Sequence, residues 1–494
     1  MQTIGMSAAS SGMGGILAHR LDSKSDRGGG KQEAGGWLDT PVIISLGLHQ
    51  AACRRASVPV EAFAINQRRV GMRHVKWAVV VLGLVAMAFG LDAVQGQPLS
   101  GEYKIGVLEP LTGNLAVQGK LHLEGYEIMR DLINERFGGV MGKKLVFVTG
   151  DAVDPTVAAS EATRLATREG VKIISGTFSS TLCGAASEAA SRQNVIYWET
   201  SCVDPRLTRR GLKNVFRTEI DGTGFGWYNV EFIAKHLAHR LGKKTSELRV
   251  AYLSEDSSYG QSVTETARQR AKQEFGMQEV AAEYYTFTTN DLTPVILKLK
   301  NANPDILHHI ARDQDAILFW RQAREQNFQV KAVVHAGATG YGAPGFGKAF
   351  GNDANGPFAL LEPGPGLIIE KMRPEGQRIE RAFREAVKAK TGADITGGHQ
   401  LAGGGLWVLK LALDAAKTDD LDKFRAAVLA MDIPVGSAVN GWGVKFDETG
   451  QNSNARVQHY MLQWQNGSLV TVWPEEFTTN RAKWIPLGAW DQRK

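Results

Sequence analysis

Short apolar runs alternate with longer amphipathic stretches from residue 103 to residue 361, and this alternation restricts the fold more than any other feature. Apolar runs of this kind, separated by helical stretches, indicate strands of parallel sheets that helices cover on both faces. Helices are predicted at 181–192, 226–240, 261–275, 292–301 and 315–326. Strands are predicted at 103–108, 145–148, 171–174, 195–198, 248–253, 280–285, 305–310, 330–335 and 358–361.

The C-terminal part of the chain has a different pattern. Three consecutive helices are predicted at 375–390, 399–417 and 419–431, and short strand-like runs follow at 443–446, 457–465 and 469–473. A single α/β barrel is not expected to end in antiparallel hairpins. The sequence therefore predicts an α/β fold of two doubly wound lobes joined by a multi-segment hinge. We expect lobe 1 at 97–220 plus about 356–435, lobe 2 at 221–355 plus about 436–475, and a C-terminal tail at 476–494.

The first hundred residues predict export. Residues 1–71 show no sustained periodicity and are expected to be disordered or a wrongly assigned extension, with Met72 as the true start. A basic stretch at 72–76, an apolar run at 77–91 and small residues before Gln97 describe a secretory signal peptide over 72–96. A membrane anchor is the alternative interpretation of the apolar run. We expect a periplasmic protein.

Charge and composition exclude several classes of function. The net charge is +6, but residues 1–96 hold ten Lys or Arg against six Asp or Glu, so the basic excess lies mostly in the N-terminal stretch. Nucleic-acid binding needs a concentrated basic face, and we expect no nucleic-acid partner. The hydrophobic content of 43% excludes wholesale disorder.

Residues 171–207 form the most informative segment for function. A predicted strand leads into a serine-rich turn at 176–180, which opens directly into a helix, and the next strand ends in a second polar turn at 199–202. Hydroxyl groups and unpaired backbone N–H groups at a helix N-terminus can receive a carboxylate or another oxyanion. Adjacent parallel strands bring both turns to one edge of the sheet, where open α/β sheets bind ligands. Ordinary helix capping is the alternative.

The other motifs give weaker evidence for a functional site. Residues 340–345 match the pattern G-x-G-x-x-G, but Pro344 stands inside the turn, so a glycine-rich cleft loop is favoured over a dinucleotide site. The sequence has no hydrolase elbow or zinc-protease motif, and we expect neither a catalytic site, a metal site nor a cofactor. Cys183 and Cys202 form either a disulfide or two buried free thiols.

Several segments in order resemble the solute-binding proteins of ABC importers, in the Leu/Ile/Val-binding (type I periplasmic) family. The resemblance covers about 102–474 and is carried by YKIGVLEPLTGNLAVQGKLHLEGYEIMRDLIN at 103–134, SGTFSST at 175–181, DPRLTRRGLKNVFRT at 204–218 and LSEDSSYGQSVTE at 253–265. It implies two lobes on a three-segment hinge that close over a small ligand and then dock on a membrane permease. It also implies that the protein is not an enzyme. A ligand-sensing module that reports to a regulator or receptor is the alternative function.

The resemblance assigns the ligand site residue by residue. The family's carboxylate site falls on Ser180, with Ser179 beside it, and on Ser201 in the same turn as Cys202. Two positions differ from the family pattern: Val203 lacks the hydroxyl that usually meets the ligand ammonium, and no carboxylate stands at 337–338, where Ala338 lies. Gln118 occupies the place of a frequent aromatic residue in the first loop, and Tyr259 matches the second-lobe tyrosine.

These differences leave two interpretations of the ligand open. Either Glu199 or Asp313 supplies the negative charge for an ammonium group, or the ligand is a carboxylate or amide without an amine, because a buried ammonium without a paired carboxylate would be costly. Arg312 could hold a second anionic group, or it caps the helix that follows. The walls of the pocket are expected to be Phe178, Trp198 and Tyr259.

Overall fold

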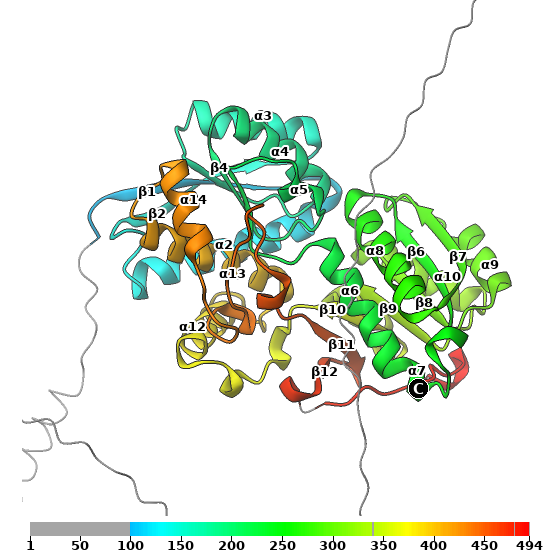
Figure 1. Cartoon of the computed structure of the whole chain (residues 1–494). Helices are drawn as coiled ribbons and strands as arrows, with labels where there is room; N and C mark the ends of the chain where they lie inside the picture. Colours follow the sequence, from blue (N-terminus) through cyan, green and yellow to red (C-terminus); the bar gives the residue numbers. More distant parts are fainter. Residues whose placement is uncertain (1–98, 338–339, 479, 494) are drawn as a thin grey trace, which may run out of the picture. The chain divides into compact units, whose positions relative to one another are not determined.

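The computed structural model of this chain describes residues 99–337, 340–478 and 480–493. These residues form two β-sheets, and helices cover both faces of each sheet (Figure 1). The predicted fold class is thereby confirmed. The expected extension over 1–71 and the expected signal peptide over 72–96 lie outside the described residues.

The smaller sheet has five parallel strands in the order β2-β1-β3-β4-β5. Helices α3 (Pro155–Thr167) and α4 (Ser180–Arg192) pack on one face, and α2 (Ala116–Arg136) packs on the other. The strands are β1 (Glu102–Glu109), β2 (Lys144–Asp151), β3 (Ile173–Ser175), β4 (Ile196–Glu199) and β5 (Val215–Arg217). The short strand β5 was not predicted from the sequence.

Side-chain alternation explains why these apolar runs are strands and not helices. Successive side chains of a strand point to opposite faces. Along β4, Ile196 and Trp198 enter the core beneath α2, whereas Tyr197 enters the core beneath α3 and α4. Both faces are buried, so the run is apolar throughout, as expected for a central parallel strand.

The larger sheet has seven strands in the order β12-β11-β10-β9-β8-β6-β7. Strands β6 to β10 are parallel to one another, whereas β11 runs antiparallel to both β10 and β12. The strands are β6 (Arg249–Glu255), β7 (Gln278–Tyr285), β8 (Ile306–Ile310), β9 (Ala332–Ala336), β10 (Phe358–Leu361), β11 (Tyr460–Gln465) and β12 (Ser468–Trp473).

Helices also cover both faces of the larger sheet (Figure 1). One face is covered by α6 (Gly222–Phe232), α7 (Ala238–Arg240) and α8 (Ser258–Phe275). The other is covered by α9 (Thr293–Ala302), α10 (Asp313–Glu325) and α11 (Pro344–Phe350). The glycine-rich motif at 340–345 forms a short 3-10 turn and the start of α11. A Cβ at Gly342 would overlap the side chain of Leu361, so this motif packs within its own half of the fold.

The chain passes three times between the smaller-sheet core and the larger sheet. The first passage follows β5, the second follows β10, and the third leads into β11. Between the second and third passages the chain forms α12 (Pro374–Thr391), α13 (Gly397–Ala416) and α14 (Leu421–Ala430), which pack in the core of the smaller sheet.

One local expectation needs correction, and two others can be placed on the fold. Strand β10, which follows the boundary expected at about 356, pairs with β9 of the larger sheet. Residues 443–446 were expected to be strand-like but form no strand. Val444 and Phe446 form only isolated β-bridges, with Ile433 and Asn452. The tail at 476–494 packs on the larger sheet, where the Trp490 indole N–H donates to the Phe328 carbonyl over 2.8 Å.

Among the described residues, no helix combines the length and the apolar character needed to cross a membrane.

Candidate functional site

Two adjoining pockets lie where the parallel strands of both sheets reach their carboxyl ends. They share Phe178, Ser201 and Val203. The smaller one, which we name the serine pocket, is lined by Phe178, Ser179, Ser180, Ser201, Val203, Tyr259 and Arg312. The larger one, which we name the glutamate pocket, is lined by Gln118, Leu121, His122, Phe178, Ser201, Val203, Glu219, Phe225, Gly337, Glu362, Gly398 and Leu401.

The turn after β3 presents the serines because its backbone is held in an unusual conformation. Gly176 has φ +115°, and a Cβ there would overlap the carbonyl oxygen of Leu108. Phe178 has φ +66°, a left-handed conformation that is uncommon for a bulky residue and that concentrates at functional sites. This conformation aims the Phe178 ring into both pockets. Ser179 and Ser180 then form the N-terminus of α4.

Ser180 ties the two predicted polar turns together. Its hydroxyl oxygen accepts hydrogen bonds from the backbone N–H groups of Val203 and Asp204, each over 3.2 Å. Because the oxygen acts as the acceptor in both bonds, the hydroxyl hydrogen of Ser180 can be donated to a ligand.

A disulfide makes the same connection covalently. Cys183, on the first turn of α4, is bonded to Cys202, and their Cα atoms lie 6.7 Å apart. This resolves the two alternatives that the sequence left open in favour of the disulfide. The two turns that carry Ser180 and Ser201 are therefore joined to each other both by the hydrogen bonds of Ser180 and by the disulfide.

Glu199 and Trp198 lie behind the pockets and do not line either of them. The carboxylate oxygen Oε1 of Glu199 accepts the backbone N–H groups of Thr200, Ser201 and Cys202 at 2.8 to 3.0 Å. Burial raises the pKa of Glu199 to about 7, although these three backbone donors act in the opposite direction. Glu199 therefore shapes the serine turn from behind and lies outside both pockets, where it was expected to meet a ligand ammonium.

Trp198 is part of the core, which corrects its expected place in the pocket wall. Its indole N–H donates to the Gly405 carbonyl over 2.9 Å, and its ring packs on Phe216, Phe424 and Phe446. The side chain points away from the carboxyl edge because Trp198 and Glu199 stand within β4 and not after it.

Arg312 brings a cation to the serine pocket from the larger sheet. It follows β8 closely and is 7% exposed. Its guanidinium lies 5.5 Å from the Tyr259 ring centre and 6.0 Å from that of Phe178, and it contacts Glu255 at 3.5 Å. Its Nε atom has no hydrogen-bond partner among the described residues. Tyr259 commits its hydroxyl hydrogen to the Ala336 carbonyl over 2.6 Å, so it offers a ligand mainly its ring.

Gln118 and Asp313 join across the mouth of the pockets. The side-chain amide of Gln118, from α2, donates to the Asp313 carboxylate over 2.6 Å. Gln118 lines the glutamate pocket as predicted, whereas Asp313, at the start of α10, lines neither pocket. Gly337 lines the glutamate pocket, and Ala338 lies outside the described residues.

Three residues that sequence reasoning missed form a buried charged cluster at the glutamate pocket. The imidazole Nε2 of His459 lies 2.8 Å from the Glu219 carboxylate and 3.7 Å from that of Glu362. Glu219 follows β5, Glu362 follows β10 and His459 precedes β11, so each comes from one of the three passages between the sheets. The available signal was the position of each residue next to a strand end, but their pairing depends on the tertiary fold.

The charges of this cluster follow from competition between burial and pairing. Burial by itself would lower the pKa of His459, but the Glu219 and Glu362 carboxylates outweigh it and raise the pKa to about 9. Burial also raises the pKa of Glu219 to about 7, even though His459 pulls it down. At neutral pH the imidazole is therefore protonated.

His122 adds a neutral polar group to the same pocket. Burial, assisted by nearby His399, lowers its pKa to about 3. Its Nδ1 lies 3.2 Å from the Ser201 hydroxyl, and its ring meets Phe178 edge-on with ring centres 4.8 Å apart. Behind it, burial, assisted by the nearby Glu199 carboxylate, raises the pKa of Glu109 well above its usual range.

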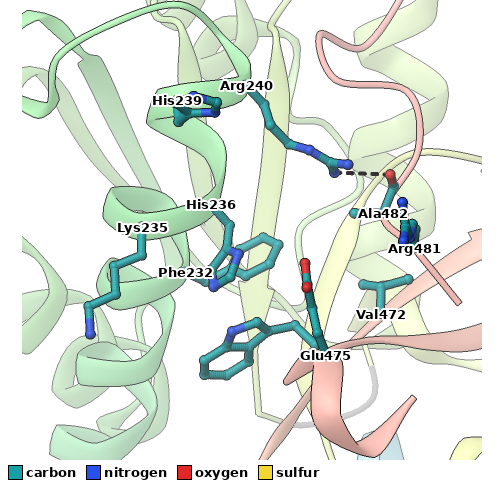
Figure 2. Close-up of a pocket in the computed structure, with 10 residues that line it drawn as sticks. Phe232, Lys235, His236, His239, Arg240, Val472, Glu475, Arg481 and Ala482 are labelled. Carbon is teal, nitrogen blue, oxygen red and sulfur yellow. Dashed lines mark hydrogen bonds between the residues drawn. The ribbon is translucent and has the colours of Figure 1, made fainter. Parts of the chain in front are cut away.

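A further pocket of about 570 Å³ lies beside α6 and α7 and near β12 (Figure 2). In Figure 2 the Lys235 side chain extends away from the other lining residues, and it forms an ion pair with Glu231. Arg240 donates to the Ala482 carbonyl over 2.9 Å. This pocket contains no residue predicted to bind a ligand. We therefore take the serine and glutamate pockets, which combine predicted ligand residues from both sheets, as the candidate site.

Comparisons with known proteins agree with this geometry. A family model described as periplasmic binding protein matches residues 102–468. The Leu/Ile/Val-binding protein homolog 7 of Brucella suis is 35% identical over 393 residues, which cover 79% of this chain and 96% of that protein.

Solved structures share the fold. A branched-chain amino acid transporter substrate-binding protein from Streptococcus pneumoniae, in complex with isoleucine, has a TM-score of 0.62 at 20% identity and covers 75% of this chain and 99% of its own. A solute-binding protein of an ABC transporter from Rhodopseudomonas palustris, in complex with 4-hydroxybenzoate, has a TM-score of 0.62 at 18% identity. The match covers 78% of this chain and 99% of that protein. The chain therefore belongs to the periplasmic binding protein family, which consists of extracytoplasmic solute-binding proteins and not of enzymes.

Proposed function

We propose that this protein is the extracytoplasmic ligand-binding component of an ABC importer. In this proposal it closes two lobes over a small amino-acid-like, carboxylate or amide ligand and delivers that ligand to a membrane permease. Family membership supports the class of function, and a structural neighbour from Rhodopseudomonas palustris is the solute-binding protein of an ABC transporter.

The observation that carries the proposal is that both pockets take residues from both sheets. Ser180 and Ser201 come from the smaller sheet, Tyr259 and Arg312 come from the larger one, and Glu219 and Glu362 come from the passages between them. A ligand that contacts both halves gains its full binding energy only when they approach, so binding favours a closed arrangement. We assign the smaller sheet with α12–α14 to one lobe, the larger sheet with the tail to the other, and the three passages to the hinge.

The serine pocket is suited to the anionic or carbonyl end of a ligand. The Ser180 hydroxyl, the N-terminus of α4 and the Arg312 guanidinium are all donors without acceptor character at this point. A carboxylate is the strongest acceptor that such a group of donors can bind, and an amide oxygen is a weaker one. The solved neighbours bind ligands with and without an amine, so the fold admits both.

Export to the periplasm completes the proposal. We propose that translation starts at Met72, that residues 72–96 are a signal peptide and that the mature chain begins at Gln97. N-terminal sequencing of the protein from its native cells tests this directly, and the presence of residues 1–71 in the mature chain would contradict it.

A thermal-shift screen tests the binding function. The panel contains branched-chain and aromatic amino acids, their deaminated acids and their amides. A ligand at a hundred times its dissociation constant stabilises the native state by about 2.7 kcal/mol. We expect at least one panel member to stabilise the wild type and to lose most of its effect on Ser180→Ala, whereas Ser160→Ala, on the exposed side of α3, binds normally. A shift that survives in Ser180→Ala would place the ligand elsewhere, and no shift from any member would contradict the proposed ligand class.

A further inference from the structure

The glutamate pocket contains charges that a ligand with only a carboxylate or amide end would not use. Glu219 is buried and Glu362 is 5% exposed, yet both line this pocket. The Glu219 oxygen Oε2 has no hydrogen-bond partner among the described residues. Buried carboxylate oxygens without donors are costly, so this end of the pocket has unused capacity to accept hydrogen bonds.

His459 accounts for only one of the two negative charges. Its ring is enclosed by aromatic side chains, with ring centres 4.7 Å from Phe225 and 5.6 Å from Trp442. The imidazolium is therefore held in place and cannot move toward the pocket to serve both carboxylates equally. Two carboxyl groups beside one imidazolium leave excess negative charge facing the pocket, although at neutral pH burial keeps Glu219 partly protonated and so reduces that charge.

The other buried cation nearby does not balance that charge. Arg217 donates its Nη1 hydrogens to the carbonyls of Cys202 and Asp204 and its Nε hydrogen to Gln451. Its positive charge also interacts with four carboxylates, which are Asp221, Glu199, Asp204 and Glu219. The excess negative charge at the glutamate pocket therefore remains.

The positive groups lie at the opposite end. Of these two pockets, Ser179, Ser180 and Arg312 line the serine pocket alone, whereas Glu219 and Glu362 line the glutamate pocket alone. The two pockets meet at Phe178, Ser201 and Val203, which contribute apolar surface and one hydroxyl group. A molecule that spans both pockets would therefore pass from a donor-rich end, over an apolar middle, to an acidic end.

We propose that Glu219 and Glu362 form a cation subsite, and that the ligand is an extended small molecule with a carboxylate at one end and an ammonium or guanidinium group at the other. This inference rests on the proposed function, because it assumes that the two pockets hold one ligand. It assigns the cation to Glu219 and Glu362, which lie on the first and second passages between the sheets, and not to Glu199 or Asp313.

Matched ligand pairs test the subsite by isothermal titration calorimetry. L-lysine and L-norleucine share a carbon chain and differ in one terminal ammonium group, as do 6-aminohexanoate and hexanoate. A charge-assisted hydrogen bond to a buried carboxylate is worth roughly a factor of ten or more in affinity. We expect the wild-type protein to bind the terminal amine of each pair at least about ten-fold more tightly.

Two variants locate the effect. Glu362→Gln keeps the shape of the side chain but removes the charge. The ratio of the affinity for each amine ligand to that for its partner should therefore fall toward one, while the affinities for norleucine and hexanoate stay the same. Glu219→Gln is the second variant, and it serves if Glu362→Gln does not fold. Glu370→Gln is the matched control, because Glu370 is an exposed glutamate paired with Arg381; its preference should equal that of the wild type.

The outcomes separate this inference from the proposed function. If norleucine and hexanoate bind as tightly as their amine partners, the cation subsite is wrong and the proposed function stands. The same conclusion follows if only other carboxylates or amides bind. If Zn²⁺ or Mn²⁺ alone stabilises the wild type but not Glu362→Gln, the cluster is a metal site, and the organic cation is excluded. If no small molecule binds in either experiment, the proposed function itself fails.

Discussion

The serine pocket and the glutamate pocket differ in how many parts of the chain build them. The serines come from two turns that are 19 residues apart at their disulfide, and Ser180 also accepts backbone hydrogen bonds from the second turn. The acidic end combines Glu219, Glu362 and His459, which come from three separate passages of the chain. One end is fixed by local, covalent connections, and the other depends on how three distant segments meet.

This difference suggests different roles in binding. A donor group that is already fixed loses little entropy when it receives a ligand, so the serine pocket suits the first recognition of a carboxylate. The acidic cluster lies on the three passages that we assign to the hinge, so in the proposed function a cation bound there would couple ligand binding directly to closure. Variants that act on only one end distinguish the two roles.

The largest effect is expected from His459→Leu. Removal of the imidazolium leaves two buried carboxylates without a counter-charge, and loss of one partner of a buried pair costs about 3–5 kcal/mol. We expect a loss of that size in the free energy of unfolding, measured in urea. Addition of Glu219→Gln to His459→Leu should recover part of the loss, since one of the uncompensated charges is then removed. A loss below about 1 kcal/mol would show that the pair behaves like an exposed one.

Removal of the disulfide should have a somewhat smaller effect, confined to the serine end. A disulfide that closes a loop of this length contributes about 3 kcal/mol. The double variant Cys183→Ala with Cys202→Ala should lose that amount in urea unfolding and should bind carboxylates more weakly. Its preference for a terminal amine, measured with lysine and norleucine, should stay at the wild-type value. A changed preference would mean that the two ends are not independent.

The smallest effect concerns pH and Glu199, which lies behind the serine turn. Burial raises the pKa of Glu199 from 4.5 to about 7 in the folded protein. A raised pKa means that the native state favours the protonated form, so its contribution to stability is full below pH 4.5 and falls as pH rises through 7. Between pH 5 and pH 7 this contribution should fall by about 2 kcal/mol.

Glu199→Gln keeps the Oε1 acceptor for three backbone N–H groups and removes the titration. We expect its urea unfolding to depend less on pH than that of the wild type by this amount. Arg217 and Glu109 also face Glu199 and are unchanged in the variant. Glu188→Gln, on the exposed side of α4, is the control and should follow the wild type. Equal pH profiles for wild type and Glu199→Gln would contradict the raised pKa.

The sequence predicted the parts of the molecule that depend on local order. Apolar runs located most strands and the helices between them, and the turn at 176–180 was correctly placed at a helix N-terminus. Ser180, Ser201, Val203 and Tyr259, which the resemblance assigned to the ligand site, line the serine pocket, and their roles in binding stay predictions. The strand β5 was missed because its apolar run is limited to Val215 and Phe216 and ends in Arg217, a charged residue that the fold buries.

The acidic cluster could not be predicted for a physical reason. Glu219 and His459 are 240 positions apart, so no local pattern signals that their side chains meet. Glu199 was predicted to bind a ligand because it stands at a strand end, but its final place depends on the three N–H groups that turn its carboxylate inward. Position at the edge of a sheet is visible in the sequence, whereas side-chain direction is set by the neighbours that the fold supplies.

The most direct test of this account is a double-variant cycle with 6-aminohexanoate and hexanoate, measured by isothermal titration calorimetry on wild type, Ser180→Ala, Glu362→Gln and the double variant. We predict that Ser180→Ala weakens both ligands equally, that Glu362→Gln weakens only 6-aminohexanoate, and that the two effects add in the double variant. If Ser180→Ala leaves both affinities unchanged, or if Glu362→Gln weakens both ligands equally, the assignment of a carboxylate end and a cation end to these two pockets is contradicted.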